Sequence, residues 1–263
     1  RVSLKGRALA SPAALRAVLE AILALDGASP SGRAGPEWGP TTTLNLASAN
    51  VCGEGAEALA AFLLHPRCAL RELSLVDNPR IGVHLPETGA PAHAVERGPD
   101  DPVLDGGGCA RLASALRSPR CRLRRLNLGG CAVDDAAAST LADAIAAPGA
   151  CPDLASLNLR SNDVGYAGAV DLKRAVMTHG LALGDVALAN NPKCPEDARR
   201  EVEDVAASNR RTSLVREMVE SCGGGAEEGG EGGVRVPGDG TNPGDDTNPG
   251  DDTHTPGDDG AGV

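Results

Sequence analysis

Cysteine and histidine are the side chains of this 263-residue chain with the most readily recognised chemistry, and the chain holds eight cysteines and five histidines. Thiolates and imidazoles act as nucleophiles, bases and metal ligands when they stand together. No Cys-x-x-Cys pair occurs, so the ligand spacing of a zinc site is missing. No serine or cysteine lies in a recognisable motif with a partnering base, and no lysine follows the glycines at 106–108. We therefore expect no catalytic residue, no metal site and no cofactor.

Three cysteines recur at one position of a repeated segment, which favours a structural role. Cys68, Cys121 and Cys151 each stand five or six residues before the first leucine of such a segment. Recurrence at one position indicates a place for a small buried side chain, and cysteine is among the most buried residue types. We expect free structural thiols, and a disulfide between two stacked units is the alternative.

The repeated segments have the pattern apolar, small polar, apolar, which is typical of a short strand whose alternate side chains face inward. The second apolar residue recurs at intervals of 29, 53, 31 and 29 residues. Each segment is followed by apolar residues at helical spacing, which predicts a helix between successive strands. The five segments are Leu44-Asn45-Leu46, Leu73-Ser74-Leu75, Leu126-Asn127-Leu128, Leu157-Asn158-Leu159 and Val186-Ala187-Leu188.

An asparagine stands three residues after three of these segments, where the chain leaves the strand: Asn78, Asn162 and Asn191. An amide at this position can bond backbone groups of the adjacent turn. Cys131 fills the same position in another unit with a weaker donor, and Ala49 in the first has neither group. Stacked units are therefore expected to carry a ladder of asparagine hydrogen bonds.

The phrase L-x-L-x-x-N/C at a period near 29 resembles the leucine-rich repeat, and the long unit with a full helix is similar to its ribonuclease-inhibitor subclass. The resemblance covers about residues 40–205. It implies an α/β solenoid (a horseshoe) with parallel strands on the concave face and helices on the convex face. The subclass is shared by ribonuclease inhibitors, Ran GTPase-activating proteins and the sensing ends of NOD-like receptors. The resemblance is therefore specific for the fold and weak for the function.

The expected domain organisation is a leucine-rich repeat domain over residues 1–220 and a tail over 221–263. The domain includes a degenerate N-terminal unit at 1–25, an inserted loop at about 83–103 and a C-terminal helical cap at about 195–220. The tail is rich in glycine, proline and aspartate, and it carries ten acidic residues and one basic residue, a net of −9 of the chain's −11. Its near lack of apolar residues predicts disorder.

The residues between the strand leucines point away from the core, and stacking places them in rows on the concave face. Their neighbours along each segment extend these rows, and six outward residues near the middle of the array form a candidate partner-binding site, which we call the polar patch. Small neighbours leave this face shallow, which suits a protein or peptide with acidic or amide groups more than a small molecule. An ordinary solvated face is the alternative. The polar patch consists of Glu72, Asp77, Arg125, Asn127, Asn158 and Arg160.

The sequence favours a non-enzymatic protein-protein interaction module. One alternative is a GTPase activator of the Ran GTPase-activating type, with a small GTPase as partner, because that class also carries an acidic C-terminal region. A GTP hydrolysis assay with a panel of small GTPases tests this alternative: acceleration would support it, and no acceleration with any of them would exclude it. Another is the sensing end of a larger regulatory protein, because the chain begins with Arg1 rather than methionine.

Composition excludes other classes of partner. Residues 1–220 carry a net charge of only −2, so the basic footprint of a nucleic-acid binder is missing. No apolar run long enough to span a membrane occurs, and no signal peptide is visible. We expect no nucleic acid and no membrane as partner, a monomer, and a location in the cytoplasm or the nucleus.

Overall fold

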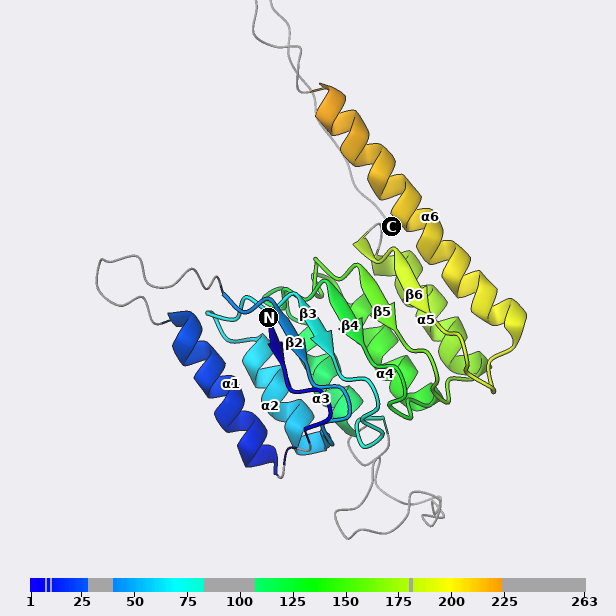
Figure 1. The fold of residues 1–263 in the computed structure, drawn as a ribbon. Coiled ribbons are helices and arrows are strands. Elements are labelled where there is room, and N and C mark those ends of the chain that lie inside the picture. Colours follow the sequence, from blue (N-terminus) through cyan, green and yellow to red (C-terminus); the bar gives the residue numbers. More distant parts are fainter. Residues whose placement is uncertain (8, 10, 28–39, 83–106, 180–181, 224–263) are drawn as a thin grey trace, which may run out of the picture. The chain divides into compact units, whose positions relative to one another are not determined.

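The computed structural model describes residues 1–7, 9, 11–27, 40–82, 107–179 and 182–223, and residues Arg1–Cys222 form one compact unit. Along these residues strands and helices alternate, and the strands make one parallel sheet in sequence order (Figure 1). This arrangement confirms the expected α/β fold class. The expected loop at about 83–103 and the tail beyond residue 223 lie outside the described residues. The strands are β1 (Val2–Ser3), β2 (Thr43–Asn45), β3 (Glu72–Ser74), β4 (Arg125–Asn127), β5 (Ser156–Asn158) and β6 (Asp185–Ala187). The helices are α1 (Pro12–Gly27), α2 (Gly53–Leu63), α3 (Gly107–Leu116), α4 (Asp135–Ala146), α5 (Tyr166–His179) and α6 (Glu196–Gly223).

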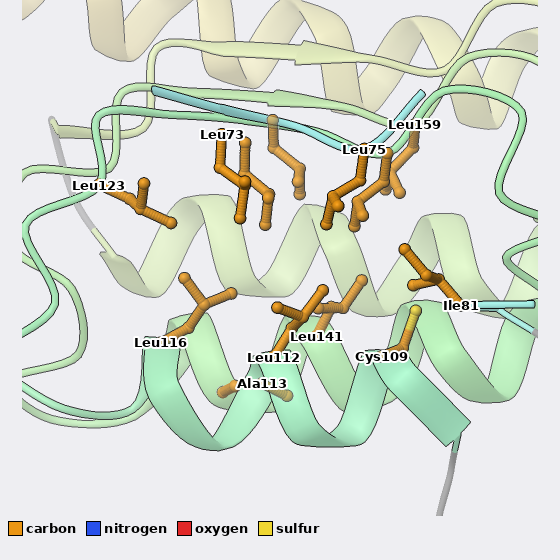
Figure 2. Close-up of a cluster of buried hydrophobic side chains, with 14 of the residues drawn as sticks. Leu73, Leu75, Ile81, Cys109, Leu112, Ala113, Leu116, Leu123, Leu141 and Leu159 are labelled. Atoms are coloured by element: carbon orange, nitrogen blue, oxygen red, sulfur yellow. The ribbon is translucent and has the colours of Figure 1, made fainter. Parts of the chain in front are cut away.

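The middle residue of each strand after β1 points into the core between the sheet and the helices. Leu73 pairs in register with Leu44 on one side and Leu126 on the other, and all three are at most 2% exposed. Figure 2 shows Leu73 and Leu75 of one strand segment directed toward Leu112 of α3. Burying each such leucine contributes roughly 2 kcal/mol, so the repeated leucines stabilise the array only when neighbouring units cover them.

Alanine allows the helices to approach one another closely. Helices α1 to α5 pack in sequence order, each against the next. The buried Ala56, Ala113, Ala138 and Ala169 lie on successive helices from α2 to α5. Alanine has no side-chain entropy to lose in a helix and a small volume, so it favours both the helix and its close neighbour.

Buried asparagines fix the turns after β3, β5 and β6, as the spacing predicts. The amide of Asn162 accepts from the N–H groups of Cys131 and Val133 at 2.9 and 3.0 Å, and it donates to the oxygens of Leu128 and Arg160 at 2.8 and 3.2 Å. Asn78 and Asn191 make equivalent bonds to the preceding unit. Each asparagine therefore joins two units through bonds that are largely buried.

The residue at the start of each turn adopts a left-handed conformation. Its φ lies between 53° and 65° in five successive units, although only one of the five residues is glycine. Serine in this region is strained, whereas asparagine, aspartate and glycine tolerate it better. The sharp bend is therefore a property of the fold that each unit adopts whatever residue stands there. The five residues are Ser48, Asp77, Gly130, Ser161 and Asn190.

Helix α6 lies at the end of the array, where it contacts both α5 and the segment that contains β6 (Figure 1). Glu203 lies beside Leu188 and Arg210 lies beside Gly184, so α6 runs antiparallel to the segment that contains β6. In the other units the N–H group equivalent to that of Leu188 donates to the next strand, as Leu159 does to Ala187. The N–H of Leu188 donates instead to Glu203 Oε1 at 3.2 Å. The Glu203 carboxylate thus accepts the hydrogen bond that a neighbouring strand accepts in the other units.

Glu203→Ala is expected to lower the free energy of unfolding by about 1–2 kcal/mol, because it leaves the Leu188 N–H without its acceptor. Urea unfolding measures the loss, and hydrogen exchange of the Leu188 amide should become faster. Asp204→Ala, the neighbouring exposed carboxylate on the same helix, is the matched control and should change neither quantity. Equal effects of the two substitutions would show that only helix charge is involved.

Candidate functional site

The residues of the polar patch come from the sheet face opposite the core, which we call the strand face. In its first row Arg125 Nη1 lies 2.8 Å from Glu72 Oε1, and both side chains are largely exposed. Thr43 Oγ1 also donates to Glu72 at 3.4 Å, and Ser156 donates to Asp185 at 2.8 Å. The structure therefore joins two of the patch residues, Glu72 and Arg125, in an exposed ion pair that contributes little to stability.

The second row brings Asn127 and Asn158 side by side in register. The side-chain oxygen of Asn127 accepts from the Gly129 N–H at 3.1 Å, and that of Asn158 accepts from the Arg160 N–H at 3.0 Å. These bonds fix each amide and engage its oxygen. Within the part of the chain that the structure describes, no acceptor is recorded for either NH₂ group, so both remain as donors on the strand face.

Arg160 and Asp77 flank these amides. Arg160 is exposed, and no carboxylate within salt-bridge distance is recorded for it among the described residues. Asp77 is exposed in the left-handed turn after β3, where its φ is 56°. The patch is therefore a set of donors on one side, with the carboxylates of Glu72 and Asp77 on the side of β3.

A groove that the sequence did not indicate runs along the beginning of the strands, and we call it the strand-start groove. Its first part lies beside β2 to β4, and its second part lies between β5, β6 and the distal half of α6. The two parts share Arg125 and Ala155 in their linings, so they lie next to each other. Its other lining residues are Thr42, Thr43, Arg71, Glu72, Arg124, Ser156, Ala182, Gly184, Asp185, Arg210, Ser213, Leu214 and Glu217.

Four of the described cysteines, Cys109, Cys121, Cys131 and Cys151, are buried, and the pKa is raised for all of these except Cys121, whose hydrogen bond with Cys151 lowers it. Burial raises the pKa of Cys109 to about 12 and that of Cys131 to about 11. The thiol of Cys131 donates to the Leu75 oxygen at 3.0 Å, in the position that asparagine fills elsewhere. A hydrogen bond with the Cys121 thiol, together with burial, raises the pKa of Cys151. Thiols held in the neutral form in this way are poor nucleophiles and poor metal ligands.

Other titratable groups form no centre in the described parts of the chain. Among those residues no three His, Cys, Asp or Glu side chains lie where they could hold one metal ion. Burial lowers the pKa of His179, and the contact of its Nδ1 with the Ile145 oxygen at 3.1 Å opposes this shift. In the same residues no helix is both long and apolar enough to cross a bilayer.

Comparison with known proteins identifies the repeat. A family model described as Leucine Rich repeat matches residues 42–60, 121–142 and 150–173. The first matched segment contains β2, the second β4 and the third β5, each with at least the first turns of the helix that follows. The sequence pattern, the family model and the strand–helix units thus coincide at the same residues.

Two curated relatives match part of the chain. The NACHT, LRR and PYD domains-containing protein 9 of Bos taurus is 29% identical over 147 residues, which make up 52% of this chain and 14% of that protein. Protein 14 of the same type from Homo sapiens is 26% identical over 178 residues, 64% of this chain and 15% of that protein. The chain therefore spans about a seventh of the length of these relatives. A solved structure of the leiomodin-1 actin-binding site 2 matches with a TM-score of 0.34 and 17% identity, over 44% of this chain and 80% of that one.

Proposed function

Because the chain is a leucine-rich repeat protein of the ribonuclease-inhibitor-like type, we propose that it acts as a non-enzymatic interaction module that binds a protein partner on the strand face. Leucine-rich repeats suggest protein partners, and the identity of this partner is open. The single observation that carries the proposal is the pair of aligned amides, Asn127 and Asn158, next to the exposed guanidinium of Arg160.

The chemistry of these groups describes the partner. Two fixed NH₂ groups and a guanidinium are all hydrogen-bond donors, so they match a surface of carboxylates and carbonyl oxygens. Gly129 lies beside Asn127 and Arg160 and carries no side chain, so nothing projects from the strand face at this position. Donors held by their own backbone bonds lose little conformational freedom on binding, which favours affinity.

The test is affinity capture by the full chain, followed by a binding titration with the purified protein that is captured. Arg125→Glu with Arg160→Glu is expected to weaken that binding by at least about tenfold, because like charges would face the acidic groups of the partner. Arg7→Glu with Arg16→Glu makes the same change in net charge on exposed residues of the first unit and serves as the matched control. Unchanged binding of the Arg125/Arg160 variant, with its thermal unfolding also unchanged, would remove the polar patch as the site.

A second candidate is the repeat-bearing end of a longer regulatory protein. The observation that favours it is the alignment with a seventh of two much longer proteins whose names include other domains. An antibody raised against the repeats would test this proposal on the protein from its natural source. A band much heavier than 26.5 kDa supports it, and a band at that mass contradicts it.

A further inference from the structure

A short sequence occurs twice at the beginning of the strands. Residues 66–71 and 119–124 both read Pro-Arg-Cys-x-Leu-Arg, and they join α2 to β3 and α3 to β4. The two copies stack, because the Arg124 N–H donates to the Arg71 oxygen at 2.7 Å. The first arginines of the copies, Arg67 and Arg120, occupy equivalent turns and are both exposed. Stacking thus turns a repeat in sequence into two neighbouring rows of guanidinium groups.

These two connections and the first residue of β4 carry an excess of positive charge, and we call them the arginine rim. Asp153 lies 2.7 Å from Arg71 and 3.9 Å from Arg122, and Glu72 lies 2.8 Å from Arg125. For the other four arginines no ion pair is recorded within the described residues, and all four are exposed. Ion pairs with two carboxylates are therefore recorded for three of the seven arginines. The rim consists of Arg67, Arg71, Arg117, Arg120, Arg122, Arg124 and Arg125.

The strand-start groove extends this rim toward α6. Arg71, Arg124 and Arg125 line its first part, and Arg210 and Leu214 of α6 line its second part. Leu214 is 52% exposed, which is a large fraction for a leucine on a helix that packs against a core. The groove therefore offers cations along one stretch and an uncovered apolar side chain along the next.

We propose that the arginine rim and the strand-start groove bind an acidic segment of a partner protein, with an apolar side chain of that segment on Leu214. This inference rests on the proposed interaction function and adds a second surface to it. The planar guanidinium forms paired hydrogen bonds with a carboxylate, so rows of arginines suit a chain of aspartates and glutamates. Several such charges also steer an acidic partner toward the groove.

The groove itself disfavours a nucleic acid as its occupant. Glu72, Asp185 and Glu217 interrupt the cations that line it, and a phosphate backbone requires a continuous run of cations. No aromatic side chain lies among its described lining residues, so bases would find no surface on which to stack. A peptide can place neutral or apolar residues opposite the three carboxylates, whereas every nucleotide brings another negative charge.

The test uses the full chain and a fluorescein-labelled peptide of 15 residues in which every fourth residue is leucine and the others are aspartate or glutamate. Fluorescence anisotropy at 150 mM salt is expected to show binding of this peptide and not of its asparagine and glutamine counterpart. Arg67→Glu, Arg120→Glu and Arg124→Glu together are expected to weaken binding at least about tenfold. The matched control combines Lys5→Glu, Arg7→Glu and Arg16→Glu, three exposed cations of the first unit, and is expected to change binding less than twofold.

Each remaining outcome bears on the proposal. Leu214→Ser should weaken the binding of the leucine-containing peptide, and it should leave unchanged the binding of a peptide with glycine in place of leucine. The proposal would be overturned if the acidic peptide did not bind, or if the rim variant and its control lost equal affinity for it. It would also be overturned if poly(U) RNA or vesicles with anionic lipids bound more tightly than the peptide. Arg125 belongs to both surfaces, so Arg160→Glu alone separates them. If Arg160→Glu weakens binding of the captured partner and leaves binding of the peptide unchanged, both proposals stand. If the rim variant still binds the peptide as tightly as the unchanged protein does, the rim proposal fails and the proposed function is unaffected.

Discussion

Asn162→Ala is expected to destabilise the protein by about 3 kcal/mol, because it removes one amide that serves four backbone groups. The N–H groups of Cys131 and Val133 lose their shared acceptor, and the Leu128 oxygen loses its amide donor. The Arg160 oxygen also loses this amide, but it keeps the Gly130 N–H as a donor. Asn162 is only 4% exposed, so water cannot replace these bonds without opening the turn. The loss falls between the units of α4 and α5, in the middle of the array, where both neighbours depend on the contact.

Urea unfolding followed by circular dichroism measures this loss. Asn158→Ala is the matched control, since this asparagine lies on the strand face and its recorded bond is to the Arg160 N–H two residues away. The control should lower the free energy of unfolding by less than about 1 kcal/mol. If Asn162→Ala and Asn158→Ala had equal effects, the asparagine ladder would not be a major source of stability.

Gly82→Ala is expected to cost about 3 kcal/mol, near the upper end of the usual cost of overpacking. A methyl group on Gly82 would lie 2.4 Å from the oxygens of both Ala132 and Cys131, and 2.5 Å from the Ala132 carbonyl carbon. These are backbone atoms of the next unit, so no rotamer change can relieve the contact. The Gly82 N–H also donates to the Cys131 oxygen at 3.0 Å, and any retreat of the chain would break that bond.

Thermal unfolding and urea unfolding of the purified variant measure the effect. Gly53→Ala is the matched control, because a methyl group there meets only the Gly108 nitrogen at 3.9 Å and the residue begins helix α2. Alanine in a helix is favoured over glycine, so the control should be neutral or slightly stabilising. A Gly82→Ala variant as stable as the control would mean that the two units do not approach each other so closely.

The sequence was sufficient to predict the repeated unit because each unit carries its own signals. The alternation in Leu73-Ser74-Leu75 predicts a strand with one buried face. The following Asn78 indicates a turn whose backbone groups need a hydrogen-bond partner. Units of like sequence then stack in register, so aligning the repeats position by position predicts which residues share a row on the strand face. Glu72 and Arg125 could be aligned in this way before any coordinates, and the structure joins them.

The groove and the rim could not be predicted in the same way. Helix α6 has no counterpart among the repeats. Its position depends on contacts such as that of Glu203 with Leu188, which the spacing of the repeats does not predict. Net charge also averages over the whole surface, so a value of −2 for residues 1–220 conceals the arginines that gather at one rim. The repeated Pro-Arg-Cys-x-Leu-Arg was the available signal, and it becomes informative only once stacking is known.

The bond between Glu203 and Leu188 also bears on self-association. A parallel sheet has no natural last strand, and an uncovered border recruits strands from other molecules. Here a single helix and one carboxylate close that border. Loss of the Glu203 side chain, or local fraying of α6, is expected to expose the outer side of β6 as a template on which a second molecule could add its own strand. The covering of this border thus depends on helix α6 and on one of its carboxylates.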